Sequence, residues 1–155
     1  MCLITKQTTP TILNEDLIVY KELKYIEGEI YSNCEDFPYE LNKLYQTEIK
    51  KTTDLCYNDH IVEQYYNLTG FSLLGLKEEY KKQHLKSYGK GFHFYNSIER
   101  LNLSNEPFKN DVLVYQQVTV KCTIPKGSKV YFDDTELGVA NQIILDEIVD
   151  AYKYL

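Results

Sequence analysis

The strongest pattern in the chain is an alternation of apolar and polar residues from Val112 to Ile124. Its even positions are mostly valine and end with Cys122 and Ile124, whereas glutamine, threonine and lysine fill its later odd positions. Successive side chains of a β-strand point to opposite faces of a sheet, so the alternation predicts a half-buried strand with Cys122 in the core. A Pro-Lys-Gly turn follows, and Lys129–Phe132 is predicted to return as a hairpin strand.

Four other segments have the composition of strands. Leu17–Tyr25 begins with β-branched and aromatic residues and then alternates, and Leu44–Ile49 is a shorter segment of the same kind. Phe92–Tyr95 is aromatic, and Gln142–Val149 is rich in isoleucine and valine near the end of the chain. β-branched and aromatic residues are enriched in strands because they pack well on a pleated surface.

The middle of the chain has the 3.6-residue spacing of helices. Asn58 or Asp59 is a suitable cap for a first helix, and Ser72 is suitable for a second that ends before a glycine-rich segment. Asn96, with Glu99 three residues later, has the spacing of a capping box for a short third helix. The apolar residues that share one face are Ile61, Tyr65 and Leu68 in the first helix and Leu73, Leu76 and Tyr80 in the second.

This order of elements predicts the fold class. Strands come first, helices lie mid-chain and strands close the chain, an order that favours α+β over parallel βαβ winding. The expected architecture is a mostly antiparallel sheet with two or three helices inserted mid-chain. The chain has 155 residues and contains no long linker, so residues 1–155 are predicted to form a single domain.

Charge and composition narrow the possible partners. There are 17 lysine and arginine residues against 23 aspartate and glutamate residues, a net charge of −6, and Arg100 is the only arginine. An acidic chain with one arginine is a poor candidate for sequence-specific binding of nucleic acid, although a local basic patch stays open. The 15 tyrosines fit a protein interface, because a tyrosine ring buries area while its hydroxyl stays bonded, and they fit equally the composition expected from an A+T-rich genome.

The expected location is the cytoplasm. No apolar run approaches the roughly 20 residues that span a bilayer, and the first residues lack the pattern of a signal peptide. The four cysteines form no Cys-x-x-Cys pair, and no histidine lies at ligand spacing from them. We therefore expect no membrane contact, free thiols, no metal site and no cofactor.

Two segments carry candidate chemistry. In Tyr88–Leu101, two glycines precede an aromatic strand that contains His93, which is either an acid–base group at an aromatic slot or a structural histidine. In the predicted hairpin, three residues are a weak candidate site for an anion, with an ordinary solvated turn as the alternative. These residues are Lys126, Ser128 and Lys129.

Separated pieces of the sequence resemble one family over nearly the whole chain. They are the Met-Cys-Leu start, the early VYK strand, the GFH strand and the late C-T-IPKGS-K-VYF hairpin. The family consists of small, functionally uncharacterised proteins of gut bacteria and their phages. The resemblance implies an accessory protein of a phage, of a mobile element or of their host. It also implies a location in the cytoplasm of a bacterial host cell or in a virion.

A second resemblance is to the ADP-ribosyltransferase fold. The segment YGKGFHFYNSIERL is similar to the G-K-G-I-Y-F-A segment of these enzymes, and IPKGSKVYF followed by NQIIL is similar to their hairpin and last strand. Asn141 and Gln142 stand where that family has its catalytic glutamate, and Tyr20 and Lys21 stand where it has a first-strand arginine or histidine. The resemblance implies a pocket for a ligand or partner. Its residues are Tyr20, Lys21, Gly91, His93, Tyr95 and Gln142.

Three hypotheses on function follow. The main one is a non-enzymatic accessory protein that acts by protein–protein interaction, either as a host-defence inhibitor or as a virion component. The alternative is an ADP-ribosyltransferase-like protein that binds NAD or a nucleotide but lacks the catalytic glutamate, in which His93 and Gln142 face one cleft. The third is a homo-oligomer in which the strand Val112–Ile124 pairs with a second copy.

Overall fold

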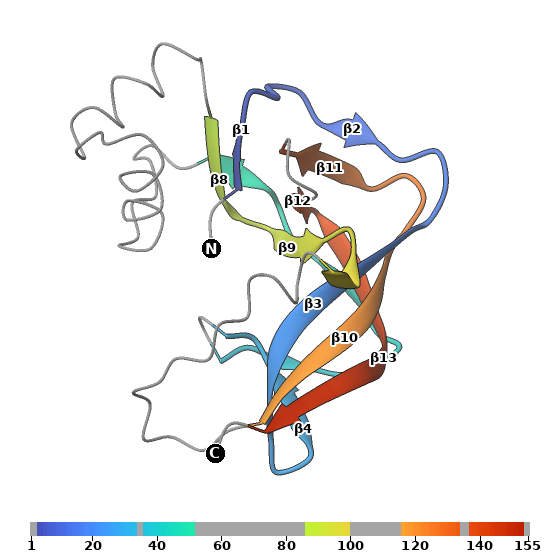
Figure 1. Ribbon diagram of the computed structural model, residues 1–155. Helices are drawn as coiled ribbons and strands as arrows, with labels where there is room; N and C mark the ends of the chain where they lie inside the picture. Colours follow the sequence, from blue (N-terminus) through green and yellow to red (C-terminus); the bar gives the residue numbers. More distant parts are fainter. Residues whose placement is uncertain (1–2, 34–35, 52–85, 100–115, 134–136, 154–155) are drawn as a thin grey trace, which may run out of the picture.

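The computed structural model describes residues 3–33, 36–51, 86–99, 116–133 and 137–153 (Figure 1). Within these ranges the protein is built from antiparallel β-strands, and helical backbone is limited to Ile98 and Glu99. The predicted α+β class is therefore wrong for the described part of the chain. The first predicted helix and most of the second lie outside the described residues.

The described residues form strands along most of their length, and Figure 1 labels the strands where there is room. They are β1 (Leu3–Thr5), β2 (Thr11–Ile12), β3 (Leu17–Ile26), β4 (Glu29–Tyr31), β5 (Pro38–Tyr39), β6 (Leu44–Gln46), β7 (Lys50–Lys51), β8 (Lys86–Lys90), β9 (Phe92–Tyr95), β10 (Gln116–Ile124), β11 (Lys129–Phe132), β12 (Leu137–Ala140) and β13 (Gln142–Lys153).

Part of the predicted second helix is a strand. The glycine-rich segment was expected to end that helix, but β8 pairs with β1 in the register Leu3 with Tyr88 and Thr5 with Lys86. The partner lies more than eighty positions away in the sequence, so helical spacing within the segment could not reveal the pairing. Burial of Tyr88 between the sheets favours the strand over local helix propensity.

A ten-stranded sheet forms the body of the molecule. Its main path is β2-β11-β12-β9-β3-β10-β13-β6. Off this path, β4 pairs with β3, and β5 pairs with β4. Every residue of β10 pairs with β3, and β13 lies on its other side. Because β10 has a strand on each side, the third hypothesis, in which its edge pairs with a second copy, is wrong for Gln116–Ile124.

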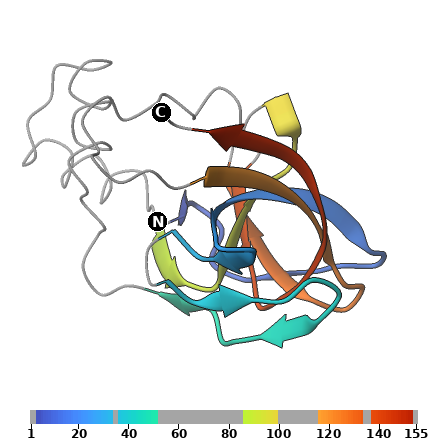
Figure 2. The same cartoon turned by 90° about the horizontal axis from the view of Figure 1, so that it is seen from below.

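A bend at Asn141 wraps this sheet around its core. Asn141 separates β12 from β13, and its backbone N–H donates to the carbonyl of Lys129 at 3.1 Å while its side-chain oxygen accepts from the N–H of Lys129 at 2.9 Å. Before the bend the chain pairs with β9 and β11, and after it with β10 and β6. Figure 2 shows the strands curving around the interior, where Cys122, as predicted, is fully buried.

A smaller sheet covers part of the larger one. Its order is β1-β8-β7, and its buried residues Leu3 and Tyr88 form a second apolar cluster with Val139 of β12. The Tyr88 ring stacks on Tyr131 of β11 with ring centroids 4.1 Å apart. This contact joins the two sheets through a pair of aromatic side chains.

Gln7 connects the strands at the end of the large sheet near β2. Its side-chain oxygen accepts from the N–H of Phe132 at 2.9 Å, and its amide donates to the carbonyl of Thr9 and to the hydroxyl of Thr11 at 2.8 and 3.0 Å. Its own carbonyl accepts from the Tyr88 hydroxyl at 3.0 Å. One residue thus links β11, the segment before β2, and the small sheet.

Substitution of Gln7 by alanine should lower the free energy of unfolding by about 1–2 kcal/mol. The loss follows because the N–H of Phe132 would be left without its side-chain acceptor in a partly buried place. Urea titration measures the change. The matched control is Gln46→Ala, which removes an exposed bond to Gln142 and should cost less than about 0.5 kcal/mol. Equal losses for the two variants would contradict the role of Gln7.

Candidate functional site

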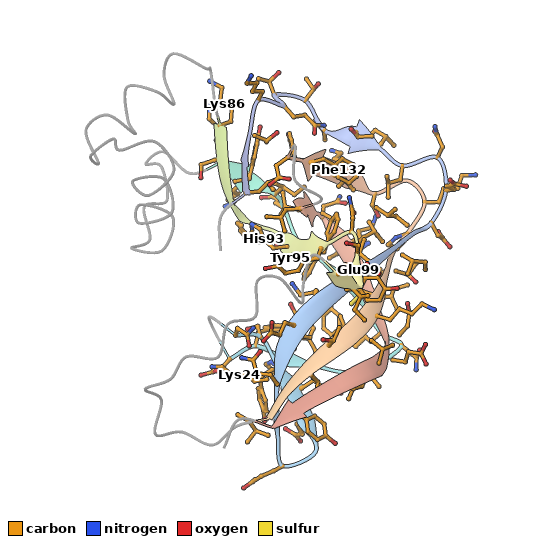
Figure 3. All side chains as sticks on the ribbon, viewed as in Figure 1. Lys24, Lys86, His93, Tyr95, Glu99 and Phe132 are labelled. Atoms are coloured by element: carbon orange, nitrogen blue, oxygen red, sulfur yellow. The ribbon has the colours of Figure 1, made fainter. Side chains whose placement is uncertain are left out.

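Most of the predicted pocket residues meet where β3 and β9 cross. The two strands pair only through Tyr20 and Tyr95, so they separate on either side of this contact. Lys21 lies on the next position of β3, and its ammonium donates a hydrogen bond to the backbone carbonyl of His93. The structure therefore brings Tyr20, Lys21, His93 and Tyr95 together, and Figure 3 shows the two labelled members of this set on β9.

The His93 ring holds β9 against β8. Its Nε2 lies 3.1 Å from the carbonyl of Tyr88. A carbonyl only accepts, so Nε2 carries the proton and donates. Burial, together with the nearby charge of Lys21, lowers the pKa of His93 to about 4. The imidazole is therefore neutral near pH 7, and its observed contact is that of a structural histidine.

Gly91 serves the protein's own packing at the turn between β8 and β9. Its φ of 141° lies in a region that residues with a side chain rarely adopt. A Cβ at this position would overlap the side chain of Val139 on β12. The backbone at Gly91, which was predicted to line a ligand pocket, thus lies close to another strand of the protein itself.

Gln142 has different surroundings from His93. It begins β13, and its side-chain oxygen accepts from the amide of Gln46 on β6 at 2.9 Å in an exposed position. His93 instead faces the carbonyl of Tyr88 on β8. The two side chains therefore have different partners on different strands, whereas the nucleotide-binding hypothesis requires them to line one cleft.

The predicted anion residues differ in exposure. Ser128 is fully buried, and its hydroxyl has no hydrogen-bond partner among the described residues. Lys126 and Lys129 are exposed, and the backbone N–H of Lys126 donates to Asp16 at 2.7 Å. The hairpin thus presents its two lysines to solvent and its serine to the interior.

The described ranges contain one free cysteine and no cluster of side chains that could hold a metal ion. Cys122 is a free thiol there, and burial raises its pKa to about 12. No cluster of three histidine, cysteine, aspartate or glutamate side chains with the spacing for a metal ion occurs in the part that the structure describes. The same part contains no helix that is long and apolar enough to cross a membrane.

The surface that the sequence did not reveal is one side of β13. Within the described ranges, β6 pairs with β13 only from Gln142 to Ile144, and one further backbone bond joins Asn42 to the carbonyl of Leu145. We call the side of Asp146–Lys153 that faces away from β10 the β13 edge. No described strand pairs with it. Only the strand order identifies this edge, because the amino-acid composition of β13 does not distinguish a strand at the edge of a sheet from one in its interior.

Exposed apolar side chains accompany the β13 edge. Ile148 is 37% exposed and Val149 is 40% exposed. Leu41 precedes Asn42 in the turn before β6, and Leu44 is the first residue of β6, where it pairs with Ile144; they are 39% and 45% exposed. Exposed apolar side chains grouped beside an unpaired strand edge are typical of a site for another chain.

Acidic side chains lie at the start of the β13 edge. Asp146 accepts from the hydroxyl of Thr123 at 2.6 Å, and Glu147 lies 3.9 Å from the ammonium of Lys121. The register between β10 and β13 also shifts twice along this stretch. Such bulges bend a strand and restrict which segments can pair with its edge.

Comparison of the chain with protein-family models, with curated proteins and with solved structures gave no match in any of the three. The two resemblances of the sequence analysis therefore stay predictions.

Proposed function

We propose that this protein functions by binding another protein, which adds an extended segment to the β13 edge. The observation that carries the proposal is the β13 edge, with which no described strand pairs, together with the exposed side chains of Ile148 and Val149. Backbone N–H and C=O groups along such an edge supply affinity for a further strand, and alternate side chains supply specificity. The phage or mobile-element setting comes from the resemblance alone and stays a prediction.

The charge of the chain favours a basic partner segment over a second copy. Two copies, each with a net charge of −6, repel one another before contact. A segment that carries lysine or arginine is instead attracted to the carboxylates of Asp146 and Glu147. The apolar side chains beside them offer contact for aliphatic or aromatic residues of the same segment.

A photo-crosslinking amino acid at Val149 tests the proposal. The comparison protein carries it at Ile18, which is 43% exposed but belongs to β3, a strand that β10 separates from β13. Both proteins are incubated in extracts of bacterial cells, with and without phage infection. We expect one defined protein to be crosslinked from Val149 and not from Ile18.

The double substitution Ile148→Lys and Val149→Lys supplies the matched variant. Added before irradiation as an unlabelled competitor, it should be at least tenfold less effective than the original chain in reducing the crosslinking from Val149. The reason is that lysine on an edge strand opposes pairing. Its melting temperature should stay near that of the original chain, since both side chains are exposed. Capture of the same proteins from both crosslinker positions, or of a second copy alone, would overturn the proposal.

A further inference from the structure

The small sheet gathers lysines on two neighbouring strands. Lys50 and Lys51 make up β7, and Lys86 and Lys90 begin and end β8. Lys50, Lys51 and Lys90 are exposed, and Lys86 is half-buried. We call these four residues the lysine face, and Figure 3 shows Lys86 at the end of β8, well separated from Lys24 in that view.

The register places two of these charges opposite one another. Lys50 pairs with Lys90 across β7 and β8. Residues directly opposite in an antiparallel pair have Cβ atoms about 5 Å apart and share a face, and like charges in that arrangement are destabilising. The free protein therefore carries a repulsion that a bound anion would remove.

Among the residues that the structure describes, no acidic side chain is paired with the lysine face. In the described ranges the ion pairs are Lys24 with Asp36, Lys43 with Glu40, and Lys121 with Glu147, all on other strands and turns. Glu48 is the nearest acidic residue in sequence, and it forms none of these pairs. The lysine face is thus a local concentration of positive charge on a chain with a net charge of −6.

We propose that the lysine face binds a phosphate-bearing anion, with Lys50 and Lys90 donating to the same phosphate group. A phosphate oxygen accepts from an ammonium at hydrogen-bond distance, and lysine binds phosphate as a point charge without the planar fork of arginine. The inference is independent of the β13 edge, because it concerns other strands and ligands of the opposite charge.

Two probes distinguish the sources of phosphate. Tripolyphosphate presents compact, closely spaced phosphates, and a ten-nucleotide oligothymidylate presents the phosphates of a nucleic-acid backbone. Binding of each is measured by isothermal titration at 20 mM salt and at several higher concentrations. We expect at least one of them to bind. A ten-residue polyglutamate tests whether any flexible anion suffices, and it should bind at least tenfold more weakly than the better phosphate probe.

The decisive variant is Lys50→Gln with Lys90→Gln. It should weaken binding of the better probe at least tenfold. If the probe is the oligonucleotide, the slope of log Kd against log salt should fall by about 0.7 for each lysine lost. The matched control is Lys126→Gln with Lys129→Gln, which removes the same charge from the hairpin and should change Kd less than twofold.

A measurement without ligand examines the repulsion itself. The Lys50→Gln and Lys90→Gln variant should melt at the same temperature as the original chain or higher at low salt, and the difference should disappear at 1 M salt, where charges are screened. The inference is overturned if neither phosphate probe binds, if the hairpin variant loses binding instead, or if polyglutamate binds as tightly as phosphate.

Discussion

Substitution of Gly138 by alanine is expected to lower the free energy of unfolding by about 2–3 kcal/mol. Gly138 lies on β12, directly opposite Phe94 on β9. A Cβ at this glycine would overlap the Phe94 ring and lie 2.7 Å from its Cε2 atom. Added atoms in a close-packed core force neighbours from their rotamers and typically cost 1–3 kcal/mol.

The Phe94 ring has little room to move away. It is 2% exposed, and it meets the ring of Phe132 edge to face with centroids 6.2 Å apart. Urea unfolding of Gly138→Ala measures the cost, and a reduced midpoint with an unchanged slope shows that stability alone has changed.

A double-mutant cycle shows whether the clash with Phe94 is the cause. Phe94→Leu alone should cost about 1 kcal/mol or somewhat more, since it keeps an apolar side chain of smaller size. In the Phe94→Leu background, the added cost of Gly138→Ala should fall below about 1 kcal/mol, because the smaller side chain leaves space for the methyl group. Contacting residues are expected to show such coupling. Fully additive costs would show that Phe94 is not responsible.

Local alternation predicted several strands well. Phe92–Tyr95 and Lys129–Phe132 have the predicted bounds, and the strand from Leu17 ends at Ile26, one residue later than expected. The strand predicted from Val112 is described from Gln116 onwards. In β10 the alternate side chains of Val118, Val120, Cys122 and Ile124 are all buried, so the sequence records their burial with the two-residue period of a strand.

Strands that depend on distant partners were not predicted. β12 contains Gly138, a residue disfavoured in strands, and it is stabilised by β9 and β11 on either side. β8 was expected to end a helix, and its pairing with β1 and β7 follows from register between segments far apart in the sequence. Local propensity holds no information about such pairings.

The same limit applies to the candidate sites. The contact of Tyr20 with Tyr95 was suggested only through the ADP-ribosyltransferase resemblance, and the structure pairs these two residues. The juxtaposition of Lys50 with Lys90 had no signal in the sequence, since forty residues separate them. The β13 edge likewise became visible only when the strand order was known.

Acidification is expected to destabilise the protein through His93. The pKa of His93 is about 4 in the folded state, below the value of 6.5 for an unperturbed histidine. Between these two pH values the unfolded chain binds a proton that the folded chain does not. The free energy of unfolding therefore falls as the pH drops from about 6.5 to about 4, by about 3 kcal/mol from this group, and this contribution levels off below pH 4.

The variant His93→Gln isolates this contribution. Glutamine does not titrate, and its amide is able to donate to the carbonyl of Tyr88 as the imidazole does. Because the two chains share every other titratable group, the measured quantity is the difference between them in urea unfolding at pH 7, 6, 5 and 4. We expect this difference to change by about 3 kcal/mol in favour of His93→Gln as the pH falls. Lys21→Met should raise the pKa of His93 by removing a nearby positive charge, and so reduce the acid loss. Parallel curves for the original chain and His93→Gln would show that the imidazole is not held neutral by its surroundings.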